Sequence, residues 1–309
     1  MKQIIISILF IAIAFPLFSQ IDWSTKPKAE LKTLIEHWEN TSSKTDTILN
    51  NLGYCYAKGI IVDQDYEKAF DYYSQSAKLG YGRAINNVGD FYRNGYFVPQ
   101  DLEKAFELFT ESAKKEDEYG LTNLAEFYQE GILVEKDIQK AIALLEIAAK
   151  KEHSPALNNL GTIYFLGQAV EADYEKALMA FQKAASLNEP IAITNLGRMY
   201  SLGFGVDKDF DKALSYFNQA VDNKEMFGLY ELGNMHYNGT GTQKDIKKAI
   251  ECYEASGTLG FFQAQVNAAY IYETGDGIEK NLAKAIYWYE AAANQGDKYA
   301  IGKLEELKK

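Results

Sequence analysis

One residue pair in this chain has a spacing that could support covalent catalysis: Ser112 is followed three residues later by Lys115. A lysine one helical turn after a serine can accept the proton of the serine hydroxyl and make it a nucleophile for acyl transfer. The Ser-Asp-Asn and Lys-Thr-Gly segments that complete such an active site do not occur in the chain. We therefore interpret the spacing as coincidental.

The sequence also contains no convincing pattern of a metal-binding site. The chain has 3 histidines, none of them beside a set of potential ligands: His37, His153 and His236. Alternating aspartates begin like a calcium loop, but Lys212 stands where such a loop needs glycine; the aspartates are Asp207, Asp209 and Asp211. The sequence therefore predicts no catalytic, cofactor-binding or metal-binding residues.

The composition indicates a folded, acidic protein. Hydrophobic residues make up 47% of the 309 residues, and 22 tyrosines and 17 phenylalanines exclude a disordered chain. The formal net charge of −11 repels nucleic-acid phosphates and anionic lipids, so we expect neither as a partner. The 2 cysteines, Cys55 and Cys252, occupy positions that are apolar elsewhere in the repeats described below, which predicts buried free thiols.

Residues 1–19 have the pattern of a cleaved secretory signal peptide. Lys2 is followed by an apolar run from Ile4 to Phe18, and the small residue Ser19 precedes Gln20. The run is short for a membrane span, so an uncleaved anchor is the less favoured alternative. We expect export through the Sec pathway, to the periplasm or the exterior, and no membrane insertion after cleavage.

The rest of the chain repeats with a constant period. Leu52-Gly53 recurs six times in steps of 36 residues, as Val88-Gly89, Leu124-Ala125, Leu160-Gly161, Leu196-Gly197, Leu232-Gly233 and Ala268-Ala269. A fixed period of this length is typical of stacked supersecondary units in one elongated domain. We number the repeats 1 to 7 in this order.

Each repeat is predicted to form two helices. Six residues after the first glycine, a second one suits the left-handed position that ends a first helix: Gly59, Gly95, Gly131, Gly167, Gly203, Gly239 and Gly275. A second helix then begins after an N-capping residue: Asp65, Asp101, Asp137, Asp173, Asp209, Asp245 and Asn281.

A lysine follows every one of these caps by three residues, as Lys68 follows Asp65. Positive charge in a first turn opposes the helix dipole. We expect it to be offset in five repeats by an acid two residues before the cap: Asp63, Glu135, Glu171, Asp207 and Glu279.

The pattern also predicts the ends of the stack. Residues 20–44 form an N-terminal segment with a capping helix from Ala29 to Asn40, residues 45–300 contain the seven repeats, and residues 301–309 close the stack with charged side chains.

These repeats resemble a known family. Residues 195–213, NLGRMYSLGFGVDKDFDKA, resemble the SEL-one-like repeat (SLR) family, relatives of the tetratricopeptide repeats. The resemblance implies an all-α fold, a right-handed α-solenoid of seven antiparallel helix pairs with a capping helix at each end, acting as an adaptor for proteins or peptides. One departure concerns the turn between the helices: its second glycine is kept in Gly205, Gly241 and Gly277 but replaced by Ile61, Phe97, Leu133 and Ala169 in repeats 1 to 4. We expect these four turns to have a different shape.

By the same analogy, the first helices line the concave face, and positions that vary between repeats carry specificity. In repeats 1 to 3 these positions are mostly polar, and include Asn50, Arg83, Asn86, Asp90 and Arg93. In repeats 4 to 7 they become apolar and aromatic, and form a candidate partner-binding groove: Phe165, Leu166, Arg198, Leu202, Phe227, Tyr230, Tyr237 and Tyr270. The alternative is that several of these side chains fill gaps between repeats.

A series of asparagines precedes the Leu-Gly pairs, broken by Glu231 in repeat 6: Asn51, Asn87, Asn123, Asn159, Asn195 and Asn267. Asparagine is unfavourable inside a helix, so its recurrence indicates hydrogen bonding. A ladder of bonds between adjacent repeats is the favoured interpretation, and capture of a peptide backbone is the alternative.

The function expected from the sequence is an exported, non-enzymatic scaffold that binds a protein or peptide and needs no cofactor. Since exported SLR proteins have been linked to cell-wall chemistry, the alternative is a cell-wall-related hydrolase or β-lactam-binding enzyme that uses Ser112. The sequence identifies neither the partner nor the oligomeric state.

Overall fold

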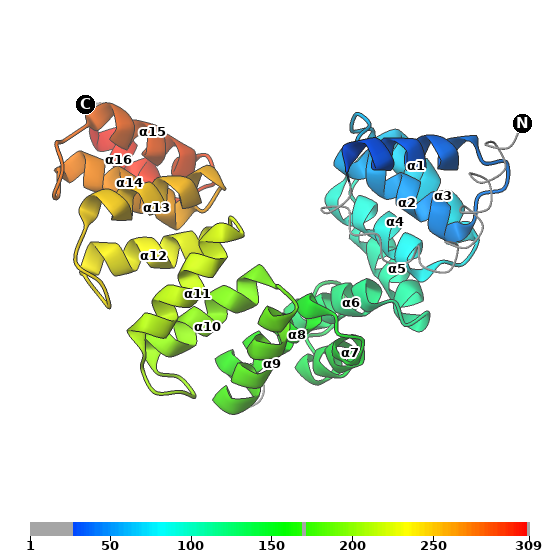
Figure 1. Ribbon diagram of the computed structural model, residues 1–309, viewed down its shortest axis with the longest axis horizontal. Coiled ribbons are helices and arrows are strands. Elements are labelled where there is room, and N and C mark those ends of the chain that lie inside the picture. The colour runs from blue at the N-terminus through cyan, green and yellow to red at the C-terminus, as the bar shows by residue number, and fades with distance from the viewer. Residues whose placement is uncertain (1–26, 169–170, 308–309) are drawn as a thin grey trace, which may run out of the picture. The chain divides into compact units, whose positions relative to one another are not determined.

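The computed structural model describes residues 27–168 and 171–307, and the predicted signal peptide lies outside these ranges. The described residues form helices and no strand (Figure 1). The chain divides into unit 1, which ends at Lys151, and unit 2, which begins at Glu152. Each unit is a stack of antiparallel helix pairs, and consecutive helices within a unit pack against each other, as expected for an α-solenoid.

Unit 1 contains seven helices among its described residues: α1 (Lys28–Asn40), α2 (Asp46–Lys58), α3 (Tyr66–Lys78), α4 (Gly82–Asn94), α5 (Leu102–Lys114), α6 (Glu118–Glu130) and α7 (Ile138–Lys150). The helix α1 covers the first repeat, with Ile35 and Trp38 buried next to Leu52 and Cys55.

Unit 2 contains nine helices among its described residues: α8 (Ser154–Leu166), α9 (Tyr174–Ser186), α10 (Pro190–Leu202), α11 (Phe210–Asp222), α12 (Met226–Asn238), α13 (Ile246–Thr258), α14 (Phe262–Thr274), α15 (Leu282–Ala293) and α16 (Lys298–Leu307). The even-numbered helices α2 to α14 are the first helices of repeats 1 to 7.

Local hydrogen bonding sets the ends of both helices, as the sequence predicted. Each first helix ends at a glycine in the left-handed conformation, with φ of 66° at Gly59 and 78° at Gly203. At the start of the second helices, the Asp65 carboxylate accepts the backbone N–H of Lys68, and Asp209 accepts that of Lys212 in the same way.

The predicted compensation of the first-turn lysines was wrong. The Lys212 ammonium lies 3.3 Å from the cap carboxylate of Asp209 and 4.9 Å from the centre of the Tyr200 ring on the preceding helix. The same lysine–tyrosine contact recurs at Lys68–Tyr56, Lys140–Tyr128, Lys176–Tyr164 and Lys284–Tyr272. The cation therefore rests on an aromatic face and its own cap, because the first helix places its tyrosine above the start of the second.

The expectation that the turns of repeats 1 to 3 differ in shape was also wrong. Ile61, Phe97 and Leu133 have φ of 67°, 62° and 60°, close to the 69° of Gly205. Closure of the turn selects the left-handed conformation even where the side chain disfavours it, so these residues retain backbone strain. Ala169 lies outside the described residues.

The glycines of the Leu-Gly pairs allow close packing in the five repeats that have them, repeats 1, 2, 4, 5 and 6. A Cβ built on Gly197 would lie 2.5 Å from the Phe217 ring of α11, and one on Gly53 would lie 2.6 Å from Tyr73 of α3. An aromatic ring of the second helix thus lies directly against the backbone of the first. This packing determines which side chains of the first helix remain exposed.

Candidate functional site

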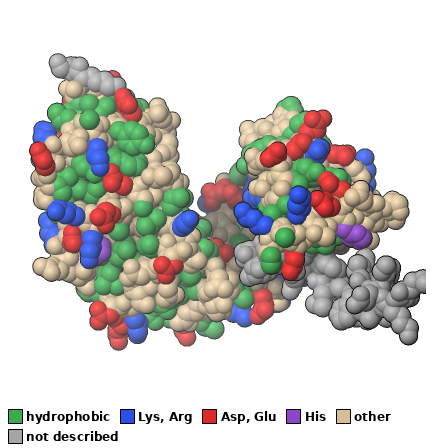
Figure 2. All heavy atoms as spheres, turned by 45° about the horizontal axis from the view of Figure 1, so that its top comes forward, with side chains coloured by type: hydrophobic (Ala, Val, Ile, Leu, Met, Phe, Trp, Pro, Cys, Tyr) green, Lys and Arg blue, Asp and Glu red, His purple; other side chains and the backbone are tan. Residues whose placement is uncertain are grey.

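All eight candidate groove residues lie in unit 2, on the first helices α8, α10, α12 and α14. Half of them are exposed: Leu166 retains 56% of its accessible surface, Leu202 53% and Tyr270 44%, and the Arg198 side chain retains 50%. Arg198 and Leu202 are four residues apart on α10 and share one helix face. In the part of Figure 2 that shows the later helices of unit 2, hydrophobic side chains are interspersed with charged ones.

The other four candidates are half-buried and pack against aromatic neighbours. Phe165 contacts Tyr174 and Phe204, with ring centres 5.6 and 5.5 Å apart. Tyr230 packs against Tyr253 and Phe261 at 5.8 and 5.0 Å. These side chains join neighbouring helices, as the gap-filling interpretation proposed.

Phe227 and Tyr237 belong to this second group. The Phe227 ring meets Phe261 edge to face, with centres 5.0 Å apart. The Tyr237 hydroxyl donates to Asp276 Oδ2 at 2.9 Å, and this hydrogen bond, with burial, raises the pKa of Tyr237. The exposed candidates are therefore Leu166, Arg198, Leu202 and Tyr270, which we call the unit 2 surface.

Three asparagines of the series, Asn87, Asn123 and Asn195, form hydrogen bonds to the preceding first helix of their own unit. Asn87 Nδ2 donates to Asn50 Oδ1 at 2.9 Å, and Asn195 Nδ2 donates to Asn158 Oδ1 at 3.0 Å. A third bond joins Asn123 to Asn86 in unit 1. The acceptor is thus the residue before the equivalent asparagine, a position that the sequence analysis assigned to the groove. The two positions cooperate because they face each other across neighbouring helices.

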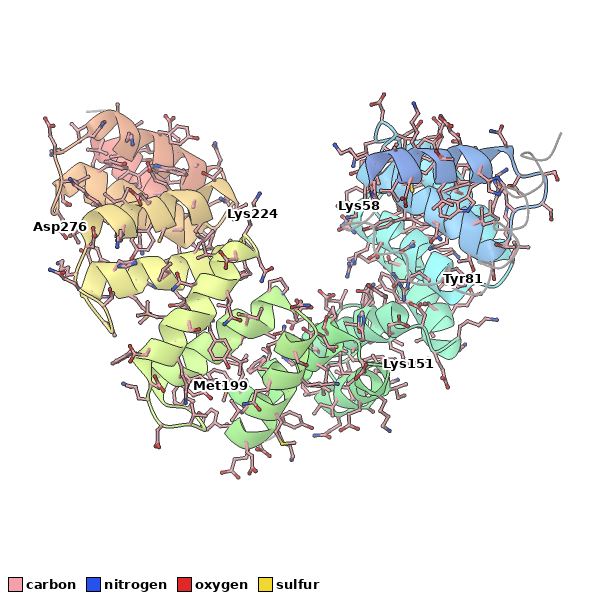
Figure 3. The ribbon with its side chains drawn as sticks, in the orientation of Figure 1. Lys58, Tyr81, Lys151, Met199, Lys224 and Asp276 are labelled. Carbon is pink, nitrogen blue, oxygen red and sulfur yellow. The ribbon has the colours of Figure 1, made fainter. Side chains whose placement is uncertain are left out.

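A concave pocket in unit 1 was not predicted as a site. It has a volume of about 640 Å³ and lies between residues of α2, α3, α4 and the N-terminal part of α6. Lys58, at the end of α2, and Tyr81, before α4, both line it (Figure 3). The polar variable positions of repeats 1 to 3 were the signal in the sequence, since Asn50, Arg83 and Asp90 all belong to its lining.

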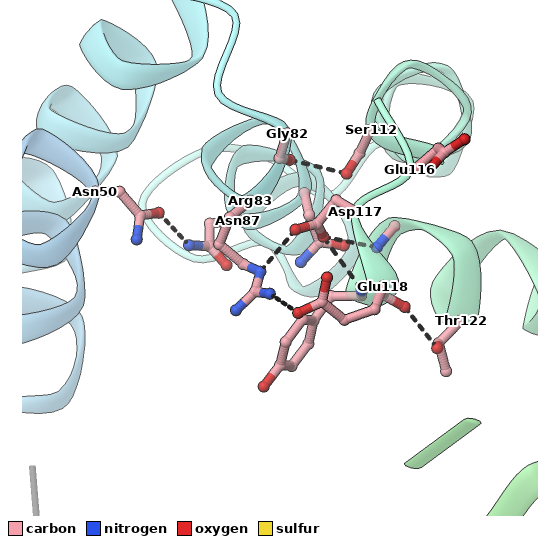
Figure 4. A network of polar contacts seen from close by, with 12 residues as sticks. Asn50, Gly82, Arg83, Asn87, Ser112, Glu116, Asp117, Glu118 and Thr122 are labelled. Atoms are coloured by element: carbon pink, nitrogen blue, oxygen red, sulfur yellow. Dashed lines mark hydrogen bonds and ion pairs between the residues drawn. The ribbon is translucent and has the colours of Figure 1, made fainter. Parts of the chain in front are cut away.

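The arginines that line this pocket are already paired. Arg83 Nε lies 2.9 Å from Asp117 Oδ2, and the guanidinium also binds Glu118 (Figure 4). Arg93 pairs with Asp90 at 2.8 Å and with Glu126 at 3.0 Å. Burial nevertheless raises the pKa of Asp90 above its ordinary value. A ligand in this pocket therefore meets guanidinium groups whose charge is largely balanced.

The structure gives Ser112 a structural role. Its side chain is fully buried and its hydroxyl donates to the carbonyl oxygen of Gly82 at 2.8 Å (Figure 4). Ser76 and Ser256 make the equivalent bond in their own repeats, to Asp46 and Met226. This hydroxyl joins two helices, which does not fit a role as an accessible nucleophile.

The cysteines are free and their thiols are shielded. Cys55 is buried, which raises its pKa to about 12, and Cys252 is half-buried, with burial raising its pKa to about 11. Within residues 27–168 and 171–307, no group of three or more potential ligands could hold a metal ion. Among the same residues, no helix is long and apolar enough to cross a membrane.

Comparison with known families finds the Sel1 repeat seven times in this chain, at residues 49–81, 82–117, 119–153, 154–189, 190–224, 227–261 and 262–297. No curated protein matches the chain.

Two solved structures are similar along most of the chain. One is a Sel1 repeat protein from Oxalobacter formigenes, 25% identical, with a TM-score of 0.63 over 92% of this chain and 82% of that one. The other is c5321, a protective antigen present in uropathogenic Escherichia coli strains that displays an SLR fold, 28% identical, with a TM-score of 0.59 over 92% of this chain. The match covers 59% of c5321, so this chain spans less than two thirds of that protein. An immunity protein from Pseudomonas aeruginosa, Pa5087, shares the fold at 20% identity and a TM-score of 0.51, with 72% of this chain and 85% of that one covered.

Proposed function

The chain belongs to the Sel1 repeat family, and from that premise we propose that it is an exported, non-enzymatic scaffold that holds a protein or peptide partner on the unit 2 surface. Sel1 repeat proteins are typically scaffolds for protein interactions. The finer assignment, to one surface of this chain, is supported by the exposure of Leu166, Leu202 and Tyr270 on first helices.

Leu166 lies on α8, Arg198 and Leu202 lie on α10, and Tyr270 lies on α14, three of the first helices of unit 2. Asn195 bonds Asn158, which links α10 to α8, and Arg198 pairs with Glu231, which links α10 to α12. Tyrosine and arginine are enriched in interaction hot spots, and the exposed leucines add apolar surface for a partner to cover. The contacts between these helices position the backbone from which the exposed side chains project.

The proposal distinguishes residues that contact the partner from residues that pack within the stack. Tyr230 and Tyr237 were candidate anchors in the sequence, but their contacts with Phe261 and Asp276 give them a supporting role in the stack. Leu202 and Tyr270 are exposed and can be truncated without removing a buried contact, whereas truncation of Arg198 also removes its ion pair with Glu231. They are therefore the residues to test.

A photo-crosslinking amino acid at position 202 tests the partner-binding surface. Crosslinking is done in cells of the source organism, with the same probe placed at Met179 on α9 as a control, since Met179 is apolar and 63% exposed but lies on a second helix. We expect one specific adduct from position 202, absent from position 179 and lost in the Arg198→Ala, Tyr270→Ala background. Equal adducts from both positions would contradict the proposal.

Export is the second part of the proposal and needs its own measurement. Its support is the pattern of residues 1–19, with a basic residue, an apolar run and Ser19 before the expected cut. Mass spectrometry of the protein recovered from the source cells should find an N-terminus at Gln20. An intact Met1 in a protein confined to the cytoplasm would contradict it.

A further inference from the structure

The unit 1 pocket contains a tyrosine hydroxyl that makes no hydrogen bond to a described residue. Tyr73 is 3% exposed, its side chain lines the pocket, and its hydroxyl makes no hydrogen bond to any described residue. Burial raises the pKa of this phenol well above its ordinary value, so the group is a hydrogen-bond donor at every physiological pH. Since Tyr73 lines the pocket, a ligand there can accept a hydrogen bond from this hydroxyl.

The equivalent tyrosines in unit 2 do have partners. The Tyr253 hydroxyl donates to Asn234 Oδ1 at 2.8 Å, and the Tyr289 hydroxyl donates to Glu273 Oε2 at 2.7 Å. Both acceptors are on the first helix of the same repeat. The open hydroxyl at Tyr73 is therefore a local feature of repeat 1 and not a property of every repeat.

Two asparagine side chains in this pocket also have hydrogen-bonding groups without a partner among the described residues. Asn51 belongs to the first repeat, and it makes no side-chain hydrogen bond within the described residues. Asn50 accepts from Asn87 through Oδ1, but its Nδ2 donates to no described residue (Figure 4). An asparagine side chain carries a donor and an acceptor side by side, as a peptide unit does, and can pair with an extended peptide backbone.

Lys58 is the basic side chain of the pocket lining that makes no direct ion pair with a described carboxylate. Lys58 is exposed at the end of α2 and makes no direct ion pair with any described residue, although its charge helps to lower the pKa of Asp90. Arg83 and Arg93, in contrast, are paired directly with carboxylates. The available groups are thus mainly donors: the Lys58 ammonium, the Tyr73 hydroxyl and the two amides. An acceptor-rich ligand that carries a carboxylate complements them.

We propose that the unit 1 pocket binds a short extended peptide segment whose carboxylate lies at Lys58, with backbone carbonyl groups accepting from Tyr73 and Asn51. This rests on the proposed function as a protein-interaction scaffold and adds a second, polar site to it. The carboxylate comes either from an acidic side chain or from the C-terminus of a chain. The pocket volume of about 640 Å³ is within the range of sites that enclose compact ligands.

Fluorescence polarisation with a labelled octapeptide of alternating alanine and glutamate tests the site on the full chain. We expect the neutral, amidated alanine–glutamine octapeptide to bind at least about tenfold more weakly than the acidic octapeptide. Lys58→Gln should weaken binding of the acidic peptide about threefold and reduce its salt dependence. Tyr73→Phe should weaken it about three- to tenfold without loss of helical circular dichroism, since Phe109 fills the same position in repeat 2.

Tyr289→Phe is the matched control. It removes the same hydroxyl from a buried tyrosine, but one that donates to Glu273 in unit 2, so it should lower the melting temperature and leave peptide binding unchanged. The amidated glutamate peptide and the alanine–glutamine peptide with a free C-terminus identify which carboxylate is read, and a preference for either one supports the proposal.

Three results would overturn it: equal affinity for the acidic and neutral peptides, wild-type affinity in Tyr73→Phe, or equally strong competition by a galacturonic acid tetramer, which has carboxylates without a peptide backbone. The crosslinks from position 202 in unit 2 do not depend on this pocket. Their presence with a failed peptide titration would reject the pocket proposal alone, and the reverse would reject the unit 2 surface alone.

Discussion

Arg198 Nε lies 2.8 Å from Glu231 Oε1, at the one repeat in which glutamate replaces the recurrent asparagine. The pair joins α10 to α12, where Asn195 and Asn158 join α10 to α8 by an amide hydrogen bond. An ion pair between an exposed arginine and a half-buried glutamate has thus taken the place of an amide contact whose acceptor is buried. The two kinds of link should differ in strength.

Loss of the ion pair should have a small effect on stability. The Arg198 side chain is 50% exposed, so the surrounding water screens its charge. We expect Glu231→Gln to lower the free energy of unfolding by about 1 kcal/mol or less, and the difference should shrink in high salt. Urea unfolding at two salt concentrations measures both. A larger, salt-independent loss would mean that Glu231 supports the stack by packing.

Loss of a ladder amide should have a larger effect. Asn158 is 7% exposed, and Asn195→Ala leaves its Oδ1 without the donor that lies 3.0 Å away. We expect a loss of about 1–3 kcal/mol in the free energy of unfolding. Asn51→Ala is the control, because Asn51 has no hydrogen-bonded side-chain partner among the described residues, and its stability should stay within about 0.5 kcal/mol of the wild type. Equal losses in both variants would contradict the ladder.

The packing around two helical glycines predicts opposite effects on stability when each is replaced by alanine. Gly197→Ala places a Cβ 2.5 Å from the Phe217 ring, whereas a Cβ at Gly302 in α16 meets no atom within 4 Å. We expect Gly197→Ala to destabilise by about 1–3 kcal/mol, and Gly302→Ala to be neutral or to stabilise by up to about 1 kcal/mol. Thermal melts that rank the two variants in the reverse order would disprove this packing.

Strain in the turns predicts a stabilising substitution. Leu133 has φ of 60° and is 48% exposed, so Leu133→Gly removes the left-handed penalty at a modest loss of buried surface. We expect a gain of about 1 kcal/mol. Leu79 is 60% exposed but has φ of −79°, so Leu79→Gly should destabilise instead. Melting temperatures of the two variants that move in the same direction would contradict the role of strain.

His236 predicts a pH dependence. It replaces the tyrosine of repeat 6, and burial, followed by the nearby Lys248, lowers its pKa in the folded state. His236 therefore binds a proton more readily in the unfolded chain than in the folded one. The contribution of neutral His236 to the free energy of unfolding is present above the ordinary histidine pKa of about 6.5 and is lost as the pH falls below it.

His236→Tyr should remove this loss. Tyrosine would offer Lys248 the aromatic face that Tyr200 offers Lys212. We expect the variant to lose less stability than the wild type between pH 7 and pH 5, measured by urea unfolding across that range. Parallel pH profiles for the two proteins would show that His236 does not contribute.

Contacts between residues close in sequence were predictable. The left-handed glycines such as Gly203 and the Asp209 cap satisfy backbone groups of their own helix ends, a few residues away along the chain. Such bonds depend on residue type and local spacing. The 36-residue period then establishes how many helix pairs stack, because every repeat must bury the same face against its neighbour. Helix boundaries and the repeat count followed from the sequence alone.

Contacts between repeats were decided by the tertiary structure. The Asn87 side chain bonds Asn50, 37 residues earlier, because neighbouring first helices bring the two positions face to face. The left-handed backbone of Leu133 follows from closure of a turn whose ends are already held by two packed helices. The open hydroxyl of Tyr73 depends on which residue its own repeat presents opposite it, where Tyr253 meets Asn234. Residue types and spacing do not specify these relationships, because a side chain's partner depends on how helices cross in three dimensions.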